Sequence, residues 1–359
     1  MAPPVLETLR IPFSRAIPWY GANSVPIDTL KPFQHYQSCV GGDGDDTFLL
    51  GCLKTPDAKS MTAPPSSSSS CVLYLHGFPD QSVDHRMGEG GSLSSSYGRF
   101  SSRMSRKLSE SFDRFCAFNF SGSPGSTTCL SFRDKTVTQE VWDVLNVMGY
   151  LSNDKSIGAG GFHIVGLSTG AIIGALLRGV STELRHQLEL PPILSITVIA
   201  SCGASSNEKA LEFDFDQQQQ QDFDAVGYCW KQFWLPKSNP NNPDGAVLKD
   251  KMDDDEGDRW VPHLLKLDQS YRDDFLTLPI RQHLMQGSDI PLLVIHGKQD
   301  TNVPLAEGLA VYEAASEPKR FVEIPKGNHL LTNSKDMKKA IRAIQEWHKL
   351  HDNKNNNDT

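Results

Sequence analysis

The chain has 359 residues, a mass of 39.7 kDa and a formal net charge of −8 at pH 7. That length allows one large domain or two of average size, and the mildly acidic balance disfavours nucleic acid or an anionic membrane surface as the main partner. The seven cysteines are scattered and show no CxxC spacing, and no secretory signal is evident, so we expect a cytoplasmic protein. No apolar run is long enough to span a membrane, so we expect no transmembrane segment.

The N-terminal part of the chain is rich in proline and glycine. Residues 1–32 are Pro-rich, and we expect them to form an irregular segment that drapes over the domain. Two strands are predicted at 33–40 and 47–53, and the glycine- and aspartate-rich residues between them are typical of a hairpin turn. Residues 57–70 end in a run of five serines and are predicted to be a low-complexity loop.

A buried strand is predicted at 71–75, and it runs into a loop that begins with the letters HGFP. In some enzymes, the loop after a strand of this kind supplies a backbone amide that binds an oxyanion. If this loop does the same, the amide is that of Phe78, because Pro79 has no N–H. A proline at this position also allows a cis Phe78–Pro79 bond. His76 is interpreted as a structural turn residue rather than a catalytic one.

A long Gly/Ser-rich loop follows, and loops of this length in compact domains are often functional. Its Asp84 and His85 either meet the substrate or form a solvated pair. An amphipathic helix is predicted over 97–111 and a strand over 115–120, followed by a tight turn at 121–126.

The next helix has a clear apolar face. Val137, Val141 and Val144 fall at i, i+4 and i+7, which predicts a helix over 137–151 packed on the sheet. Asp143 lies on the same helix, and we expect it at the surface.

Residues 161–177 contain the motif around which the rest of the chain is arranged. A buried strand at 162–165 and a buried helix at 171–177 flank the residues Gly166–Gly170, which read G-x-S-x-G. This pattern is typical of a tight strand-to-helix turn that holds Ser168 in a strained conformation, with glycines where strand and helix nearly touch. The helix N-terminus beside the hydroxyl favours a negative charge. The motif alone is weakly specific, because an ordinary glycine-rich turn gives the same letters.

A further strand at 193–200 completes an alternation of strands and helices. This order predicts an α/β fold with a mostly parallel sheet, helices on both faces and a ligand site at the carboxyl ends of the strands. The composition then shifts, and residues 202–288 are interpreted as an inserted, partly helical lid. Its glutamine run and the acidic run at 253–258 are expected to be solvated or disordered. Its aromatic residues either line an acyl or alcohol pocket or form the lid's own core: Trp230, Phe233, Trp234.

The C-terminal part of the chain supplies two more strands, predicted at 290–297 and 321–324. Asp300 follows the first of them and His329 the second. An amphipathic helix over 334–350 closes the fold.

These elements predict a core built from two stretches of the chain, residues 33–201 and 289–350. The lid at 202–288 separates the two stretches. The tail at 351–359 is expected to be disordered.

Ser168, Asp300 and His329 each follow a predicted strand, which allows positions far apart in the sequence to converge. A serine hydroxyl is a weak nucleophile, and His329 would take its proton during attack on a carbonyl and return it to the leaving group. Asp300 would hold the imidazole tautomer and stabilise the imidazolium. The amides of Phe78 and Thr169 would bind the tetrahedral oxyanion.

Other residues compete for two of these roles. His163 and His296 lie within predicted strands, where we expect them to pack in the sheet, so His329 is the preferred base. Asp214 or Asp216, after the preceding strand, is an alternative acid. The sequence contains no cluster with metal-ligand spacing and no Gly-rich phosphate loop, so we expect no metal and no cofactor, and a small-molecule or lipid-like acyl substrate as the partner.

Five segments of the chain carry a family resemblance: LYLHGF, FNFSGSPGS, VGLSTG, VIHGKQDTNVP and IPKGNH. Together they resemble the α/β-hydrolase superfamily, in particular serine esterases and lipases of the monoacylglycerol lipase or serine-aminopeptidase-like type. The resemblance covers about residues 33–350. It implies a Ser168-His329-Asp300 triad that cleaves a carboxylic ester through an acyl-enzyme. Thioesterase, amidase or C–C hydrolase activity with the same triad, and a binding protein with slow or no turnover, are the alternatives.

Two features distinguish this sequence from similar protein families. The HGFP run also resembles epoxide hydrolases, but their elbow nucleophile is Asp, and Ser168 argues against that activity. Relatives often have a second glycine two residues after the first in the turn at 121–126. Here that position is Pro124 and the glycine is Gly125. This difference affects the expected shape of the turn and not the triad.

Overall fold

The computed structural model describes residues 5–12, 48–56, 70–80, 82–83, 102–123, 126, 130–153, 157–158, 160–180, 185–186, 188–236, 246–247, 260–287 and 289–352. Several predictions made from the sequence lie outside these residues. They concern the strand at 33–40 with its hairpin turn, most of the serine-rich loop, Asp84 and His85, and the acidic run at 253–258.

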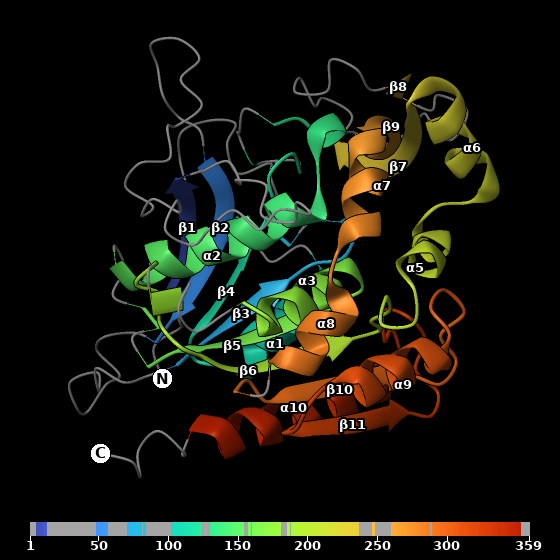
Figure 1. The fold of residues 1–359 in the computed structure, drawn as a ribbon. Coiled ribbons are helices and arrows are strands. Elements are labelled where there is room, and N and C mark those ends of the chain that lie inside the picture. The colour runs from blue at the N-terminus through green and yellow to red at the C-terminus, as the bar shows by residue number, and fades with distance from the viewer. Residues whose placement is uncertain are drawn as a thin grey trace.

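An eight-stranded sheet forms the centre of the molecule, in the order β1-β2-β4-β3-β5-β6-β10-β11 (Figure 1). The six strands from β4 to β11 in this order are parallel, whereas β1 and β2 are antiparallel to their neighbours. The predicted α/β fold with a mostly parallel sheet is therefore confirmed. The strands are β1 Val5–Pro12, β2 Phe48–Thr55, β3 Cys71–Leu75, β4 Phe115–Phe118, β5 Phe162–Leu167, β6 Ile193–Ile199, β10 Leu292–Gly297 and β11 Lys319–Ile324.

The strand β1 corrects the expectation that residues 1–32 are irregular. It pairs with β2 along its whole length, from Val5 opposite Thr55 to Pro12 opposite Phe48. Leu9 and Ile11 are buried. Prolines hide this strand in the sequence, but β1 is the edge strand, where proline is tolerated because one side of the strand needs no backbone donor.

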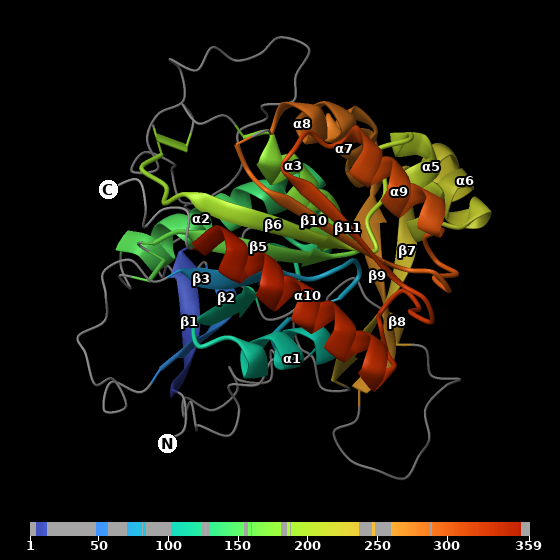
Figure 2. The same ribbon diagram turned by 90° about the horizontal axis from the view of Figure 1, so that it is seen from below.

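Helices cover both faces of the sheet, as the alternation of elements predicts. One apolar cluster joins one face to α2, α3 and α9, and a second joins the other face to α1 and α10. Figure 2 looks onto the face that α1 and α10 cover. These helices are α1 Arg103–Ser111, α2 Val137–Asn153, α3 Thr169–Arg178, α9 Leu305–Ala314 and α10 Ser334–Asp352, with a short 3₁₀ turn η5 at Phe132–Asp134.

The segment between β6 and β10 lies at one end of the sheet and contains both helices and strands (Figure 1). A separate three-stranded antiparallel sheet has the order β7-β9-β8. The glutamine run forms α6, which is capped by Asp216 and whose glutamine side chains are exposed or partly exposed. The elements are α5 Asn207–Asp214, α6 Gln217–Val226, β7 Tyr228–Pro236, β8 Ala246–Val247, β9 Trp260–Asp268, α7 Gln269–Thr277 and α8 Ile280–Gln286.

A group of buried histidines fixes the C-terminal helix against the sheet. His348 on α10 stacks on His163 of β5 with ring centroids 4.0 Å apart, and it also contacts Phe112. His163 in turn bonds Asp352 at 3.0 Å. Burial, together with the neighbouring imidazoles of His163 and His351, holds the pKa of His348 well below its usual 6.5.

We expect this histidine to make the fold sensitive to acid. Below pH 6.5 the unfolded chain binds a proton at His348 that the folded chain does not, so the free energy of unfolding falls by about 1.4 kcal/mol per pH unit from this group alone. Denaturant titrations between pH 4.5 and 7.5 give the free energy of unfolding at each pH. In His348→Phe this free energy should change with pH less steeply than in wild type, by about that amount per pH unit below pH 6.5. His186→Phe, at an exposed histidine, is the control. Equal slopes for wild type and His348→Phe would contradict the prediction.

Candidate active site

The turn between β5 and α3 holds Ser168 in an unusual backbone conformation, with φ 56° and ψ −122°. A Cβ added at Gly166 would lie 2.1 Å from the carbonyl oxygen of Gly170, and one added at Gly170 would lie 2.3 Å from that of Leu75. Strand, helix and the neighbouring β3 therefore approach too closely for any side chain at these two positions. The close approach leaves the Ser168 side chain at the carboxyl end of β5.

Alanine at either glycine should disrupt this turn. We expect Gly166→Ala and Gly170→Ala to lower the free energy of unfolding by at least about 2–3 kcal/mol, because each added methyl group meets backbone rather than a flexible side chain. Gly149→Ala in α2 is the matched control. Its Cβ would lie 3.6 Å from the nearest side chain, so it should stabilise the helix by about 0.5–1 kcal/mol. Urea denaturation measures both effects, and similar midpoints for all three variants would contradict the prediction.

Three side chains from different strand ends form one hydrogen-bonded series. The Nε2 atom of His329 lies 3.1 Å from the Ser168 hydroxyl oxygen, and its Nδ1 atom lies 2.8 Å from Oδ2 of Asp300. The other oxygen of Asp300 accepts hydrogen bonds from the amides of Asn302 and Val303, both at 2.9 Å. An ionised carboxylate only accepts, so Nδ1 of His329 carries the proton and Nε2 is free to accept one from Ser168.

The carboxyl group of Asp300 is held in its ionised form. Burial acts to raise its pKa, but the hydrogen bond from His329 and those from the Val303 and Asn302 amides outweigh it, so the pKa lies below its usual value. Asp300 is therefore negatively charged throughout the neutral pH range.

The two rival histidines have hydrogen-bond partners of their own, although Nε2 of His296 also lies 3.5 Å from Oδ2 of Asp300. Nδ1 of His163 bonds the Ser195 hydroxyl at 2.8 Å and its Nε2 bonds Asp352. His296 is fully buried in β10, where its Nε2 donates to the Val303 carbonyl at 2.9 Å. Burial lowers the pKa of His296.

The alternative acids also lie elsewhere. Asp216 caps α6. Asp214, at the end of α5, approaches the site, because the Thr169 hydroxyl lies 3.5 Å from its Oδ2. Burial raises the pKa of Asp214 to about 6, against the opposing charges of Lys231 and His329. Since Nδ1 of His329 faces Asp300, Asp214 does not orient that imidazole.

The loop after β3 lies directly against Ser168. A Cβ added at Gly77 would be 3.0 Å from Cβ of Ser168 and 3.6 Å from its hydroxyl oxygen. The next amide belongs to Phe78, and the Phe78–Pro79 bond is cis. Thr169, the first residue of α3, supplies the other amide next to Ser168. Among the described residues, neither amide donates to a backbone carbonyl.

His76 is a structural residue, as the sequence indicates. It is buried, and its Nδ1 bonds the carbonyl of Gly77 at 2.8 Å, while its Nε2 accepts from the amide of Phe120 at 3.4 Å. Burial lowers the pKa of His76 to about 3, so the ring stays neutral. The ring thus joins the loops that follow β3 and β4.

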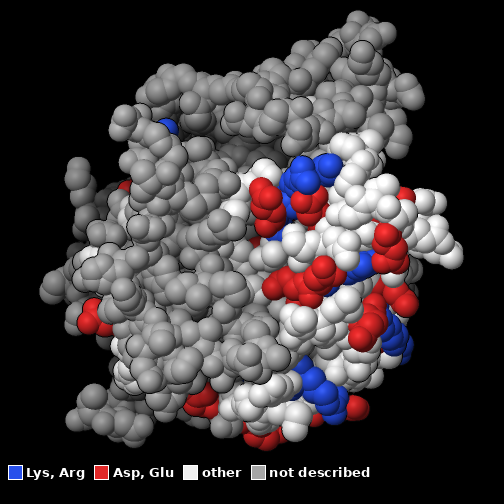
Figure 3. Space-filling model, turned by 45° about the horizontal axis from the view of Figure 1, so that its top comes forward, with Lys and Arg blue, Asp and Glu red and all other residues white. Residues whose placement is uncertain are grey.

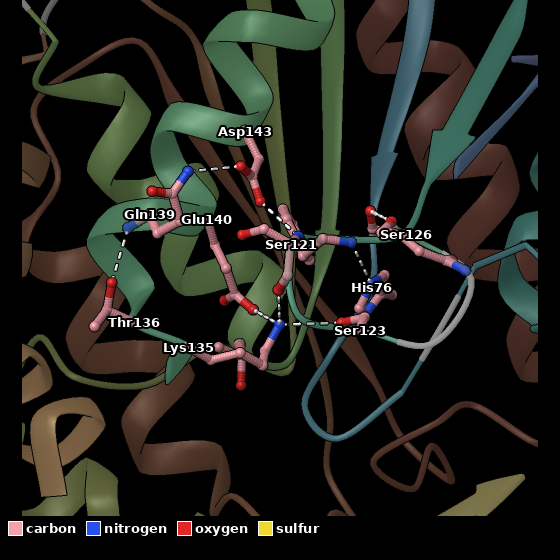
Figure 4. Close-up of polar contacts among 12 residues, drawn as sticks. His76, Ser121, Ser123, Ser126, Lys135, Thr136, Gln139, Glu140 and Asp143 are labelled. Carbon is pink, nitrogen blue, oxygen red and sulfur yellow. Dashed lines mark hydrogen bonds and ion pairs between the residues drawn. The ribbon is translucent and has the colours of Figure 1, made fainter. Parts of the chain in front are cut away.

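A buried ion pair supports the loop after β4, and no pattern in the sequence predicts it (Figure 4). The ammonium group of Lys135 lies 2.7 Å from Glu140, and both side chains are almost completely buried. It also donates to the carbonyl of Ser121 and the hydroxyl of Ser123, both at 3.0 Å. A buried charge without these partners would be costly, so the pair and the loop depend on each other.

Asp143 belongs to the same cluster, and the expectation that it lies at the surface is wrong. It is 1% exposed, and it accepts hydrogen bonds from the Ser121 amide at 2.8 Å and from Gln139 at 2.9 Å. Burial raises its pKa to about 6. The loop after β4 folds over this side of α2, and periodicity within the helix cannot reveal such cover.

A surface cavity among the described residues lies away from these side chains. It has a volume of about 450 Å³ and is lined by residues 203–207, 278–282 and 285–286, without Ser168, Asp300 or His329. No group of metal-ligating side chains occurs among the described residues. Within the same residues, no helix is both long and apolar enough to cross a membrane. On the described part of the face in Figure 3, acidic and basic side chains are interspersed.

Comparisons with known proteins agree with this architecture. Residues 72–341 match the Alpha/beta hydrolase family. A stretch of 64 residues is 39% identical to the uncharacterized protein YfhR of Escherichia coli K12, but it covers 18% of this chain and only 20% of that relative. Among solved structures, hypothetical protein PA2218 from Pseudomonas aeruginosa superposes with a TM-score of 0.54 at 13% identity, over 96% of this chain and 94% of that one. Alpha/beta hydrolase GrgF from Penicillium sp. sh18 gives 0.52 at 13% identity, over 84% and 94%.

Proposed function

The chain belongs to the alpha/beta hydrolase family, and we propose that it is a serine hydrolase that cleaves a carboxylic ester through an acyl-enzyme intermediate. The observation that carries this proposal is the series of hydrogen bonds from Ser168 through His329 to Asp300, at 3.1 and 2.8 Å. A hydroxyl, an imidazole and a buried carboxylate in this order form the arrangement that activates a serine.

In the first step, the Ser168 hydroxyl attacks the ester carbonyl as Nε2 of His329 takes its proton. A new bond joins the serine oxygen to the carbonyl carbon, and the carbonyl oxygen becomes an oxyanion. When the tetrahedral intermediate collapses, the bond to the alcohol oxygen breaks and the imidazolium returns the proton to that oxygen. Water then attacks the acyl-enzyme in the same way and releases the acid and free Ser168.

The amides of Phe78 and Thr169 are the proposed donors to the oxyanion. Gly77 lies against Ser168, and Thr169 begins the helix whose N-terminus carries a partial positive charge, so both amides are near the place where negative charge develops. The loss of one such donor typically lowers kcat by about 100- to 1,000-fold.

Residues 202–288 are proposed to act as a lid that forms part of the acyl pocket. Two of its residues already border the site, since Asp214 is within 3.5 Å of the Thr169 hydroxyl and the ammonium group of Lys231 lies 5.6 Å from the centre of the Phe78 ring. We therefore propose a small-molecule or lipid-like acyl substrate, bound between this segment and the carboxyl ends of the strands.

Covalent labelling tests the proposal directly. A fluorophosphonate probe should modify the wild-type protein once, and mass spectrometry of its peptides should place the adduct on Ser168. A panel of nitrophenyl esters with short and long acyl chains should be hydrolysed and would begin to size the pocket. A folded protein that is neither labelled nor active on any ester, thioester or amide would refute the proposal and favour a binding protein on the same fold.

A further inference from the structure

The side chain of Phe78 is surrounded by aromatic rings from distant parts of the chain. Tyr271 of α7 stacks on it with centroids 5.0 Å apart and planes at 22°, and Phe132 of η5 stacks at 5.7 Å and 12°. Phe215, which follows α5, contacts the same ring at 6.1 Å. Two of these three neighbours, Tyr271 and Phe215, therefore come from the segment 202–288.

The neighbours from that segment are firmly held. Tyr271 is fully buried and Phe215 is 2% exposed. Phe215 packs edge-on against Phe223 at 5.4 Å. The ammonium group of Lys231 lies 4.3 Å from the centre of the Phe215 ring, and it bonds the carbonyl of Asp214. Phe78 itself is only partly buried, so its ring takes its position from more rigid surroundings.

A single methylene group joins the ring of Phe78 to the backbone whose amide is proposed to bind the oxyanion. Hydrogen bonds restrain this loop on both sides of Phe78. Before it, His76 bonds the Gly77 carbonyl, and beyond it the amides of Ser82 and Val83 donate to the Asn119 side chain at 2.8 and 2.9 Å. Between these anchors the aromatic contacts hold the Phe78 ring, and the ring helps to set the direction of the Phe78 N–H.

We infer that Tyr271 and Phe215 are positioning residues, which act through the Phe78 ring to aim its amide at the oxyanion. The segment 202–288 then contributes to the rate of the chemical step and not only to the acyl pocket. This inference rests on the proposed function.

Two substitutions at one position separate the ring of Tyr271 from its hydroxyl. The hydroxyl is buried and has no hydrogen-bond partner among the described residues, so Tyr271→Phe should keep the kcat of wild type. Tyr271→Leu removes the stacked ring. We expect it to lower kcat on a short-chain nitrophenyl ester by about 10- to 100-fold, with KM changed by less than about threefold. Affinity for a boronic acid that mimics the tetrahedral intermediate should fall by a similar factor.

Phe275→Leu is the matched control for loss of packing. Phe275 lies on the same helix, is equally buried and contacts Tyr271 at 6.3 Å, but the aromatic contacts of Phe78 are to other rings. We expect its kcat to stay within about twofold of wild type although its unfolding temperature falls. Thermal unfolding curves of all variants identify a temperature at which every variant is folded, and kcat is measured at that temperature.

Phe78→Leu keeps the amide and removes the ring, and its partial exposure makes it the variant with the least effect on folding. It should lower kcat as Tyr271→Leu does, and Tyr271→Leu should have no further effect in its background, because both act through one ring. Unchanged kcat in Phe78→Leu, additive losses in the double variant, or equal losses in Tyr271→Leu and Phe275→Leu would each overturn the inference. Wild type that hydrolyses no ester would overturn the proposed function and this inference with it.

Discussion

Ser168→Ala should abolish labelling by a fluorophosphonate and lower kcat/KM for ester hydrolysis by on the order of 10⁵- to 10⁶-fold. The substitution removes the atom that forms the acyl-enzyme in the proposed mechanism and leaves the Phe78 and Thr169 amides in place. Residual hydrolysis would come from binding and from those amides alone. Steady-state kinetics with a nitrophenyl ester and intact-protein mass spectrometry after labelling measure both effects.

Ser195→Ala is the control for this variant. Ser195 is a buried serine on β6 that bonds His163, so the substitution should change stability without removing activity. Ester turnover by Ser168→Ala within tenfold of wild type would mean that another group performs the reaction, and the proposed mechanism would then be wrong.

Asp300→Asn should lower kcat by about 10⁴-fold while the protein stays folded. An asparagine oxygen can still accept the Asn302 and Val303 amides. It cannot carry the negative charge that holds the proton on Nδ1 of His329 and stabilises the imidazolium. Because the pKa of Asp300 lies below its usual value, the variant loses this charge over the whole neutral range, and the defect should persist from pH 6 to pH 9.

Asp214→Asn distinguishes the two candidate acids. Asp214 is the other carboxylate near the site, but Nδ1 of His329 faces Asp300 at 2.8 Å. We expect Asp214→Asn to cause a much smaller loss of kcat than Asp300→Asn. The reverse order would assign the acid to Asp214 and would contradict the geometry described above.

Much of the fold could be predicted because its signals are local. Buried parallel strands such as β3, β5 and β10 appear as short apolar runs bounded by turn residues, and their alternation with helices determines the sheet. The positions of Ser168, Asp300 and His329 have the same origin, since each lies in the turn that follows a strand. Their convergence is a consequence of parallel strands that end at one edge, and their roles remain proposals.

The features that could not be predicted depend on contacts between distant segments. Tyr271 has no sequence feature that connects it with Phe78, which lies nearly two hundred positions earlier. Asp143 looks like an exposed helix residue until the loop after β4 covers it. The sequence pattern within one helix or strand does not reveal partners from distant segments. The burial of Tyr271 and Asp143 is therefore seen only in the three-dimensional structure.

The strand β1 also has a consequence for how copies of this protein behave toward one another. Without it, β2 would be the outermost described strand of the sheet, and six of its eight residues are buried, most of them apolar. An open apolar edge of that kind pairs readily with the same edge of another molecule and initiates aggregation. β1 instead carries the exposed residues Glu7 and Arg10, whose charges discourage further strand addition. The first strand therefore protects the protein against self-association as well as completing its sheet.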